Sequence, residues 1–353
     1  MKKNLLIKIG GTLLTLVLVS CHSKTDTQQE VNLYEGLKTI EHEWEEDVVI
    51  IDNYHVFPSS NVCDDKLCIA VSDSVRIIDI EGNQLECIHL DSCFFTNMYY
   101  KGLCTWSFDQ LNHTLFQYNN DGTFTKDQIT KNKVVSNQNQ VYAVGNNRFA
   151  WLDVDSISNT YRLYTRKYFI ENESDSTIQH IDNDYSYNEL IGAYETIPCP
   201  RGEESIYSEI GTDNKGNFIA YCRYNSNFVV FHNDSIKIGK DYRNLPIAKV
   251  KNYGHDIRFS EGNCGIQKAT LDDNYIYCVT PRQKSTGWYA SGIDRHLDIY
   301  RTKNLEYVGS ILLPEYENHF IHTINKIGDK LVVLYISNDN IKMRIFDMTW
   351  LNL

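Results

Sequence analysis

The chain has 353 residues, with 34 Lys and Arg against 46 Asp and Glu and a formal net charge of −12. A surface this acidic repels phosphate groups, so the composition argues against nucleic acid as a partner. With 42% hydrophobic residues the chain is globular. Its single long apolar stretch, at the N-terminus, excludes a membrane protein with several spans.

The first 20 residues have the three parts of a secretory signal peptide. A basic start, Met1-Lys2-Lys3-Asn4, precedes a mostly apolar run that ends in Leu18-Val19-Ser20, and Cys21 follows directly. This arrangement resembles the bacterial lipoprotein signal, in which the cysteine thiol receives a diacylglyceryl group and the chain is cleaved before it. The resemblance implies that Cys21 is the acylated first residue and anchors the protein to a membrane. The alternatives are an ordinary secretory signal and an uncleaved anchor, although the apolar run is short for a span of about 20 residues.

The chain after the signal divides into two predicted parts. Residues 21–45 form a lipidated tether and an irregular segment, and residues 46–353 form the folded domain. Only residues 35–46 look helical or irregular, with a thin apolar stripe. Cys21 is not followed by a strong acidic cluster of the kind that resembles a surface-export tag. We therefore expect an outer-membrane lipoprotein whose folded domain faces the periplasm, with exposure at the cell surface as the alternative.

The folded domain repeats a unit of an apolar strand, a polar break, a second strand, a turn and often a third strand. The leading strands begin at residues 67, 103, 148, 218, 275 and 331. Repeats of several short strands at a spacing of about 50 residues are typical of propeller blades. The leading strands are apolar on both faces, as in strands between neighbouring blades, whereas the outer strands alternate and carry charges. A pair of two-sheet sandwiches and a β-solenoid are the alternatives.

The last unit has two clear strands, while an unpaired strand, Val48-Val49-Ile50-Ile51, lies near the start of the domain. A ring needs a contact between its first and last blades, and an N-terminal strand in the last sheet also removes an exposed edge. The sequence therefore predicts an all-β fold, a six-bladed β-propeller of antiparallel sheets closed by the N-terminal strand. Five or seven blades are the alternative counts.

A lipoprotein signal followed by such units resembles the TolB-like six-bladed propeller lipoproteins of Gram-negative gut bacteria. The most similar stretches are residues 213–221, Asp-Asn-Lys-Gly-Asn-Phe-Ile-Ala-Tyr, and residues 275–313. The resemblance implies a propeller tethered in the cell envelope with no assigned reaction. Many relatives have a Gly-Pro-Gly-Glu-like loop that is not evident here, where residues 199–204, Cys-Pro-Arg-Gly-Glu-Glu, are the candidate for its place. No site residue is therefore carried over from the family.

The other nine cysteines give little sign of chemistry. Cys68, Cys104, Cys222 and Cys278 lie in apolar strand-like runs, where a thiol acts as a small buried group. Cys63 and Cys68 are not followed by a second Cys/His pair at ligand spacing. We expect neither a metal site nor a cofactor.

The sequence contains no nucleophile elbow, phosphate-binding loop, dinucleotide fingerprint or zinc-protease helix. Three loop clusters combine charged and aromatic residues and are the candidate ligand-binding positions. They comprise Arg201, Glu203 and Glu204; His255, Asp256 and Arg258; and Arg282, Trp288, Tyr289 and Arg295. For each cluster, ordinary loop packing with charges in water is the competing interpretation.

Two functional hypotheses follow. The first is a non-catalytic, lipid-anchored module that binds a protein or glycan, and the lack of any nucleophile–base or metal pattern in the sequence favours it. The second is a propeller-fold hydrolase or lyase acting on polysaccharide, favoured by the loop acids, His255 and the aromatic residues. We expect no catalytic residues.

Overall fold

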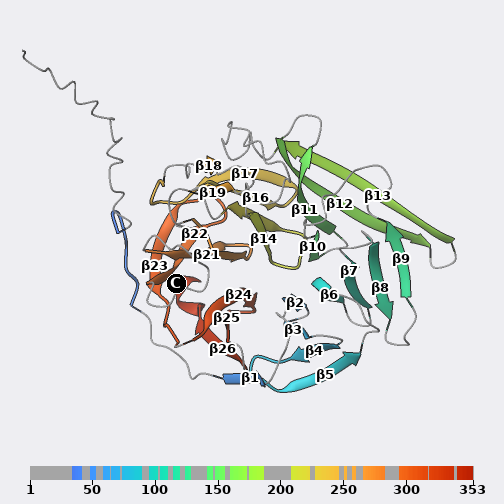
Figure 1. Ribbon diagram of the computed structural model, residues 1–353, viewed down its shortest axis with the longest axis horizontal. Coiled ribbons are helices and arrows are strands. Elements are labelled where there is room, and N and C mark those ends of the chain that lie inside the picture. Colours follow the sequence, from blue (N-terminus) through green and yellow to red (C-terminus); the bar gives the residue numbers. More distant parts are fainter. Residues whose placement is uncertain are drawn as a thin grey trace, which may run out of the picture. The chain divides into compact units, whose positions relative to one another are not determined.

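A computed structural model describes most strands of the domain and parts of their connections (Figure 1). The described residues lie in one compact unit, Leu33–Leu353. They are 34–41, 48–52, 59–63, 65–71, 74–89, 95–101, 104–109, 114–119, 124–128, 141–145, 148–155, 160–172, 175–186, 208–222, 227–245, 250–252, 257–259, 265–282, 294–316, 318–337 and 340–352. Cys21 and the predicted signal peptide lie outside them. Among the described residues, no helix has the length and apolar character needed to cross a membrane.

The described strands form six antiparallel sheets of four strands and one hairpin. The first sheet contains β2 (Ser59–Cys63), β3 (Lys66–Val71), β4 (Ser74–Ile78) and β5 (Gln84–His89). The second contains β6 (Phe95–Lys101), β7 (Cys104–Asp109), β8 (Thr114–Asn119) and β9 (Phe124–Gln128). The third contains β10 (Val141–Gly145), β11 (Arg148–Asp155), β12 (Thr160–Asn172) and β13 (Asp175–Ser186).

The C-terminal half continues the pattern. The fourth sheet contains β14 (Ser208–Thr212), β15 (Phe218–Cys222), β16 (Asn227–His232) and β17 (Ser235–Lys240), and the hairpin β18 (Val250–Asn252) and β19 (Ile257–Phe259) follows it. The fifth contains β20 (Lys268–Leu271), β21 (Tyr275–Pro281), β22 (Arg295–Arg301) and β23 (Tyr307–Leu312). The sixth contains β24 (Phe320–Ile327), β25 (Lys330–Ile336), β26 (Asn340–Asp347) and β1 (Val48–Asp52), and the 3-10 helix η1 (Thr349–Asn352) ends the described chain.

The six predicted leading strands are present, but each is the second strand of its sheet rather than the first. The strands that precede them, β2, β6, β10, β14, β20 and β24, were not predicted. Their sequences, such as Ser-Glu-Ile-Gly-Thr in β14 and Lys-Ala-Thr-Leu in β20, are short or polar. The second strands are the most apolar, and all seven residues of β21 are buried. The prediction was therefore wrong about the place of these strands in their sheets, which is second and not first.

The N-terminal strand β1 pairs antiparallel with β26, with Val48 opposite Met343 and Asp52 opposite Asn340. The sixth sheet thus combines strands from both ends of the chain. This pairing was expected from the unpaired run Val48–Ile51. The segment before it was expected to be helical or irregular, and its described part, residues 34–41, has no helix.

Neighbouring sheets pack face to face through apolar seams. The seam between the fifth and sixth sheets contains Tyr277, Leu297, Leu331 and Phe346, all nearly inaccessible to solvent. Similar seams join the fourth sheet to the fifth and the sixth to the first. Each of the strands β2, β6, β10, β14, β20 and β24 contacts the next in this order, and β24 contacts β2. Figure 1 shows β2, β6, β10, β14 and β24 towards the middle of the unit and β5, β9, β13 and β17 towards its outside.

Two sheets approach each other closely at Gly211 of β14. A Cβ added there would lie 1.9 Å from the carbonyl oxygen of Ala269 in β20. Only glycine lets the two backbones approach this closely. This close contact explains why a glycine lies inside a strand, where its loss of conformational entropy on folding would otherwise only destabilise the strand.

Tight turns join strands in the first, fourth, fifth and sixth sheets, where the structure describes them, and two of these turns share a side-chain pattern. Asp213 accepts hydrogen bonds from the backbone N–H of Asn217 at 3.1 Å and from its side-chain amide at 2.6 Å. Asp79 accepts the same two bonds from Asn83 at 2.7 and 3.0 Å. An Asp that satisfies the backbone four residues later fixes a turn without help from the core.

Residues 37–41 form a strap along the open edge of β23. Ser310 donates to the carbonyl of Lys38, Ile40 donates to the carbonyl of Ser310, both at 2.8 Å, and Thr39 forms a parallel bridge with Ser310. Ile40 packs against the apolar seam beneath. The strap covers backbone groups that would otherwise offer an edge to another chain.

Candidate functional site

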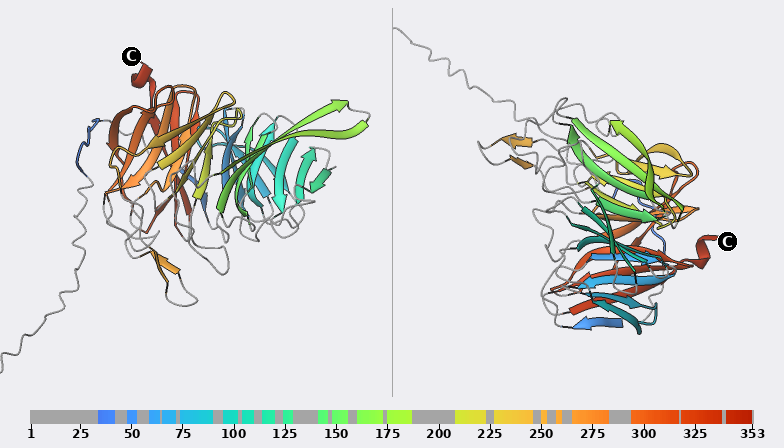
Figure 2. Two further views of the ribbon diagram at one scale, coloured as in Figure 1. Left: turned by 90° about the horizontal axis from the view of Figure 1, so that it is seen from above. Right: turned by 90° about the vertical axis from the view of Figure 1, so that its right-hand side faces the viewer.

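The candidate ligand-binding loops of the sequence all adjoin one end of two neighbouring sheets. In the fifth sheet, β21 ends at Pro281 opposite Arg295, where β22 begins. In the fourth sheet, β15 ends at Cys222 opposite Ser208, where β14 begins, and β17 ends at Lys240. We call this the loop end, because chain segments 187–207, 241–267 and 282–294 enter or leave there. The opposite end carries the tight turns. Figure 2 (left) shows the β18–β19 hairpin on one side of the sheets and η1 on the other.

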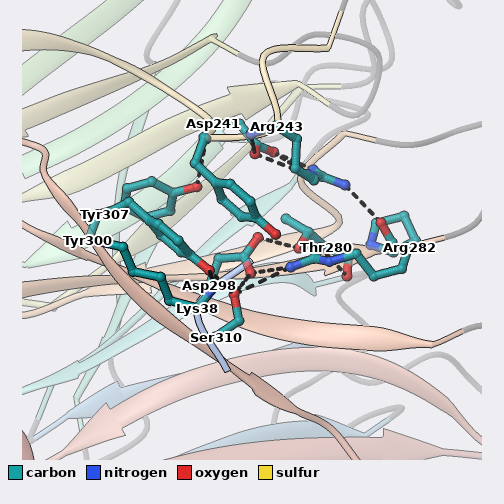
Figure 3. A network of polar contacts seen from close by, with 11 residues as sticks. Lys38, Asp241, Arg243, Thr280, Arg282, Asp298, Tyr300, Tyr307 and Ser310 are labelled. Atoms are coloured by element: carbon teal, nitrogen blue, oxygen red, sulfur yellow. Dashed lines mark hydrogen bonds and ion pairs between the residues drawn. The ribbon is translucent and has the colours of Figure 1, made fainter. Parts of the chain in front are cut away.

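The buried carboxylate of Asp298 in β22 lies at the centre of a network of polar contacts (Figure 3). Its side chain is fully buried, and it forms an ion pair with Arg282, whose Nη2 lies 2.5 Å from Oδ1. Thr280 donates to Oδ2 at 2.5 Å, and the hydroxyl of Ser310 also donates to Oδ1. Burial raises the pKa of Asp298, and the Arg282 guanidinium opposes that shift. Breaking such a pair on one side leaves an uncompensated buried charge.

A second buried ion pair, between Asp241 and Arg243, lies in the segment that leaves the fourth sheet. Arg243 Nε lies 3.0 and 2.9 Å from the two carboxylate oxygens of Asp241, and Nη2 contacts the same group. Arg243 Nη1 donates to the carbonyl of Pro281 at 2.8 Å. Because Pro281 ends β21, this bond joins the exit of the fourth sheet to the root of the segment 282–294.

Tyrosines connect these ion pairs to the strap. The ring of Tyr242 stacks on Tyr307 with a centroid distance of 4.0 Å, and the guanidinium of Arg282 lies 5.5 Å from the Tyr242 centroid. The hydroxyl of Tyr307 lies 2.6 Å from that of Ser310 and accepts a bond from the backbone N–H of Lys38 at 3.3 Å. The strap therefore rests on side chains that also contact the buried charges.

His296 lies beside this network with an unusual environment. It is 5% exposed, and its Nδ1 has no hydrogen-bond partner among the described residues. Burial, together with the nearby positive charge of Arg282, lowers the pKa of His296 to about 4. The imidazole is therefore neutral at physiological pH. The ring of Tyr34 meets it edge-on at 6.3 Å, and the Tyr34 hydroxyl donates to Asp294 at 2.8 Å.

On the other face of the fifth sheet, Arg295 lines a cavity of ≈ 70 Å³ against the sixth sheet. The cavity is lined by Arg295, Pro314, Glu315, Tyr316, His319, Ile321 and Tyr335. Arg295 is 6% exposed and donates from Nε to Gln267 Oε1 at 3.1 Å. Its Nη1 lies 3.7 Å from Glu315 Oε1, which is an ion pair without a hydrogen bond. Burial lowers the pKa of Arg295, and Glu315 opposes the shift.

The structure describes few of the candidate residues that the sequence singled out. Arg282 is engaged in the ion pair with Asp298, and Arg295 lines the cavity, so these two members of one cluster lie on opposite faces of the fifth sheet. The backbone of Arg258 lies in β19, opposite Lys251. The other candidates, Arg201, Glu203, Glu204, His255, Asp256, Trp288 and Tyr289, lie outside the described residues.

The competing interpretation of the loop clusters, ordinary packing with charges in water, does not fit Arg282 and Arg295, which are buried, and the charges of β22 are buried as well. Arg295, His296 and Asp298 are each at most 6% exposed. The reason is that both faces of β22 are covered, one by the fourth sheet and its exit segment and the other by the sixth sheet. A charge in a strand buried on both faces must be paired, which is the sequence signal that could have identified Asp298.

Among the described residues, no group of three or more His, Cys, Asp or Glu side chains is placed to hold a metal ion. Cys68 and Cys278 are buried in β3 and β21. Burial raises the pKa of the Cys278 thiol, which keeps it protonated.

No protein-family model matches the sequence, and no curated protein sequence matches it. Several solved structures are similar at low identity. A streptogramin B lyase is 11% identical over 85% of this chain and 97% of its own, with a TM-score of 0.46. Virginiamycin B lyase from Staphylococcus aureus is 12% identical over 86% and 99%, with a TM-score of 0.41. The WD40 domain of Neurospora crassa Pan2 is 5% identical over 82% and 88%, with a TM-score of 0.43.

These neighbours are β-propeller proteins. They include two lyases and a WD40 domain, which differ in what they do. The described part of this chain forms a domain made almost entirely of antiparallel sheets.

Proposed function

We propose that the chain is a lipid-anchored, six-bladed β-propeller of the cell envelope that binds a protein or glycan partner at its loop end and catalyses no reaction. The domain would be closed as a ring by β1. Support for the ring comes from the contacts that link the first strands of the six sheets in order, with β24 against β2, and from the pairing of β1 with β26.

The main support for a binding role is the hydrogen bond from Arg243 Nη1 to the carbonyl of Pro281. It fixes the roots of two loop-end segments to each other across two sheets, and the buried pairs of Asp241 with Arg243 and Arg282 with Asp298 stiffen both roots. Binding residues are commonly carried by loops on a rigid scaffold. The tight turns at the opposite end leave little chain for recognition.

The buried charges themselves favour binding over catalysis. Arg282, Arg243 and Asp298 are paired with one another or with neighbouring groups, and they are at most 5% exposed. Groups held in this way support the loops and do not meet a substrate directly. Polysaccharide hydrolysis or lysis by acids of the loop-end segments is the competing function, since such chemistry needs two carboxylates or a base facing a sugar.

Attachment through Cys21 and residence on the periplasmic face of the outer membrane belong to the same proposal. Their support is the sequence alone, in which a basic start, an apolar run and Leu-Val-Ser precede the cysteine. A lipoprotein cysteine carries several acyl chains, and together they hold the protein firmly to a bilayer.

The experiment combines labelling with partner capture. Cells expressing the full-length, tagged chain are fed an alkyne fatty acid, and membranes are cross-linked, purified on the tag and analysed by mass spectrometry. The proposal expects label and a reproducible envelope partner, with both lost in Cys21→Ser. Label without any partner, together with turnover of a polysaccharide that Glu203→Gln abolishes, would support the enzyme instead. Absence of label in the parent chain would contradict the anchor.

A further inference from the structure

The first described residue of the chain, Tyr34, lies at the loop end of the fifth sheet. Its hydroxyl donates to Asp294 Oδ2 at 2.8 Å, and its ring meets His296 edge-on at 6.3 Å. Asp294 closes the segment 282–294, because its carbonyl accepts a hydrogen bond from the backbone N–H of Arg282 at 2.8 Å. Tyr34 therefore contacts both the root of a loop-end segment and the start of β22.

The residues after Tyr34 fix this position. The backbone N–H of Leu37 donates to the carbonyl of Tyr34 at 3.2 Å, which closes a turn that contains Gly36 with a φ of +77°. The strap then pairs with Ser310 of β23 through two backbone hydrogen bonds of 2.8 Å on either side of Thr39. The N-terminal segment is thus attached to the domain from Tyr34 onward, and its first contact is at the loop end and not at the tight turns.

Few residues separate this contact from the predicted acylation site. Thirteen residue steps lead from Cys21 to Tyr34, and a fully extended chain of that length spans at most about 47 Å. The sequence predicts a tether here, and an unstructured tether of this length has a root-mean-square span of about 20 Å.

The two ends of the fifth sheet are about as far apart as this tether is long. The seven residues of β22, Arg295–Arg301, rise about 3.4 Å each, so the loop end and the opposite end lie about 20 Å apart. A membrane anchor on such a short tether holds the end where the tether enters closer to the bilayer than the other end.

The charge of the mature chain bears on what the loop end meets at that surface. Loss of Lys2, Lys3 and Lys8 with the signal peptide, which contains no acid, changes the net charge from −12 to −15. Anionic lipid headgroups repel a protein of this charge. The charge therefore argues against the lipid surface as the partner and favours a protein that projects from the same membrane.

We propose that the loop end faces the membrane that holds Cys21, and that its partner is a protein embedded in or anchored to that same membrane. This inference rests on the proposed lipid anchor and on binding at the loop end, and it adds the orientation of the domain and the location of the partner. A short tether keeps the loop end at a high effective concentration near such a partner. That concentration falls roughly as the −3/2 power of the tether length.

Energy transfer from the domain to a membrane tests the orientation. The acylated mature chain is purified from membranes of expressing cells and added to preformed phosphatidylcholine vesicles that carry an acceptor dye on their headgroups. A genetically encoded donor residue replaces Leu312 at the loop end or Lys303 in the turn at the opposite end of the same sheet, both exposed. We expect transfer from position 312 to be at least twofold greater than from position 303. Equal transfer, or more from position 303, would overturn the proposal.

A longer tether shows whether the tether causes the difference. About 40 Gly and Ser residues inserted between Gln29 and Glu30 raise the root-mean-square span of the tether to about 40 Å, so the ratio of the two transfers should fall towards one. The same insertion after Leu353 is the matched control and should leave the ratio unchanged. The same ratio with both insertions would overturn the proposal, because the tether would then not set the orientation.

Photo-cross-linking from Leu312 in cells tests the location of the partner. We expect capture of a membrane protein, and the longer tether should reduce that capture about eightfold while the C-terminal insertion leaves it unchanged. Capture of a soluble protein or a wall polysaccharide, or capture that does not depend on the tether, would overturn the assignment of a membrane partner.

The vesicle experiment also separates this inference from the function on which it rests. Mature chain that does not sediment with vesicles would contradict the lipid anchor and the inference together. Mature chain that sediments with vesicles and gives equal transfer from both positions would contradict the orientation alone.

Discussion

Arg243 donates a hydrogen bond from Nη1 to the carbonyl oxygen of Pro281 at 2.8 Å, across the seam between the fourth and fifth sheets. The donor belongs to the segment that leaves β17, and the acceptor is the last residue of β21. Two connections that are far apart in sequence are thereby fixed to each other at their roots. Buried ion pairs of Asp241 with Arg243 and of Arg282 with Asp298 lie on either side of this junction and stiffen it.

The ion pair of Arg282 with Asp298 gives the first prediction. Arg282→Met should lower the free energy of unfolding by about 3–5 kcal/mol, because it leaves Asp298 charged and unpaired in the interior. The double variant Arg282→Met/Asp298→Leu should recover most of that loss. Urea denaturation of both variants measures the effect. Lys330→Ala, which removes a partly exposed ion pair with Asp347, is the control and should cost at most about 1 kcal/mol. A double variant no more stable than Arg282→Met would contradict the account.

Gly211 gives the second prediction. Gly211→Ala should destabilise the domain by about 3 kcal/mol, because the new methyl group would meet the backbone carbonyl of Ala269, which belongs to a neighbouring sheet and cannot turn away. Gly328→Ala has no atom within 4 Å and differs only in its left-handed φ of +52°, so it should cost about 1 kcal/mol. Thermal unfolding of the two variants compares them. Similar melting temperatures would show that β14 and β20 do not approach as described.

His296 predicts a pH dependence. Its pKa is lowered in the folded state to about 4 from an ordinary value of 6.5, so the unfolded chain takes up the proton first as the pH falls. Stability from this group is complete above about pH 6.5 and decreases towards pH 4. Between pH 7 and pH 4.5 the loss should be about 2–3 kcal/mol beyond that of His296→Gln, measured as the free energy of unfolding of both proteins. Parallel pH profiles for the two proteins would argue against a buried neutral imidazole.

The strap along β23 gives a fourth prediction. A Cβ added at Gly309 would lie 2.6 Å from Ile40 Cδ1 and 3.0 Å from the carbonyl of Lys38, so Gly309→Val should displace the strap. The amides of Ile40 and Ser310, which are hydrogen-bonded between strap and strand, should then exchange with deuterium faster. The amide of Asn244, bonded to the carbonyl of Asp241, serves as the internal reference. An unchanged exchange rate of the Ile40 amide would mean that the strap does not protect the edge of β23.

Much of the architecture could be predicted from the sequence because the second strands of the sheets are buried on both faces. Runs such as Tyr275–Pro281 must be apolar throughout, so they are visible without structural information. The first strands could not be recognised in the same way. Lys268–Leu271, for example, has only four residues, begins with a charge and depends on its neighbours for its conformation.

The candidate site was less predictable for a physical reason. Arg282 and Arg295 were grouped because they flank one loop. Their side chains nevertheless lie on opposite faces of the fifth sheet and contact different neighbours. Asp298 was not predicted because its partner Arg282 lies at the end of another strand. Asp241 lies two residues from its partner Arg243, but the burial of this pair depends on packing against the fifth sheet, which the local sequence does not show. Pairing of buried charges is decided by tertiary contacts, which the spacing of residues in one sequence does not reveal.

Site-specific photo-cross-linking in cells tests the central claim most directly. A photoreactive residue is placed in the full-length chain at Asn244 or Leu312 of the loop end, or at Asp234 or Lys303 of the opposite end, all exposed positions. We expect a defined cross-linked partner from the loop-end positions and none from the others. A partner captured only from Asp234 or Lys303 would contradict it and would place recognition at the tight turns.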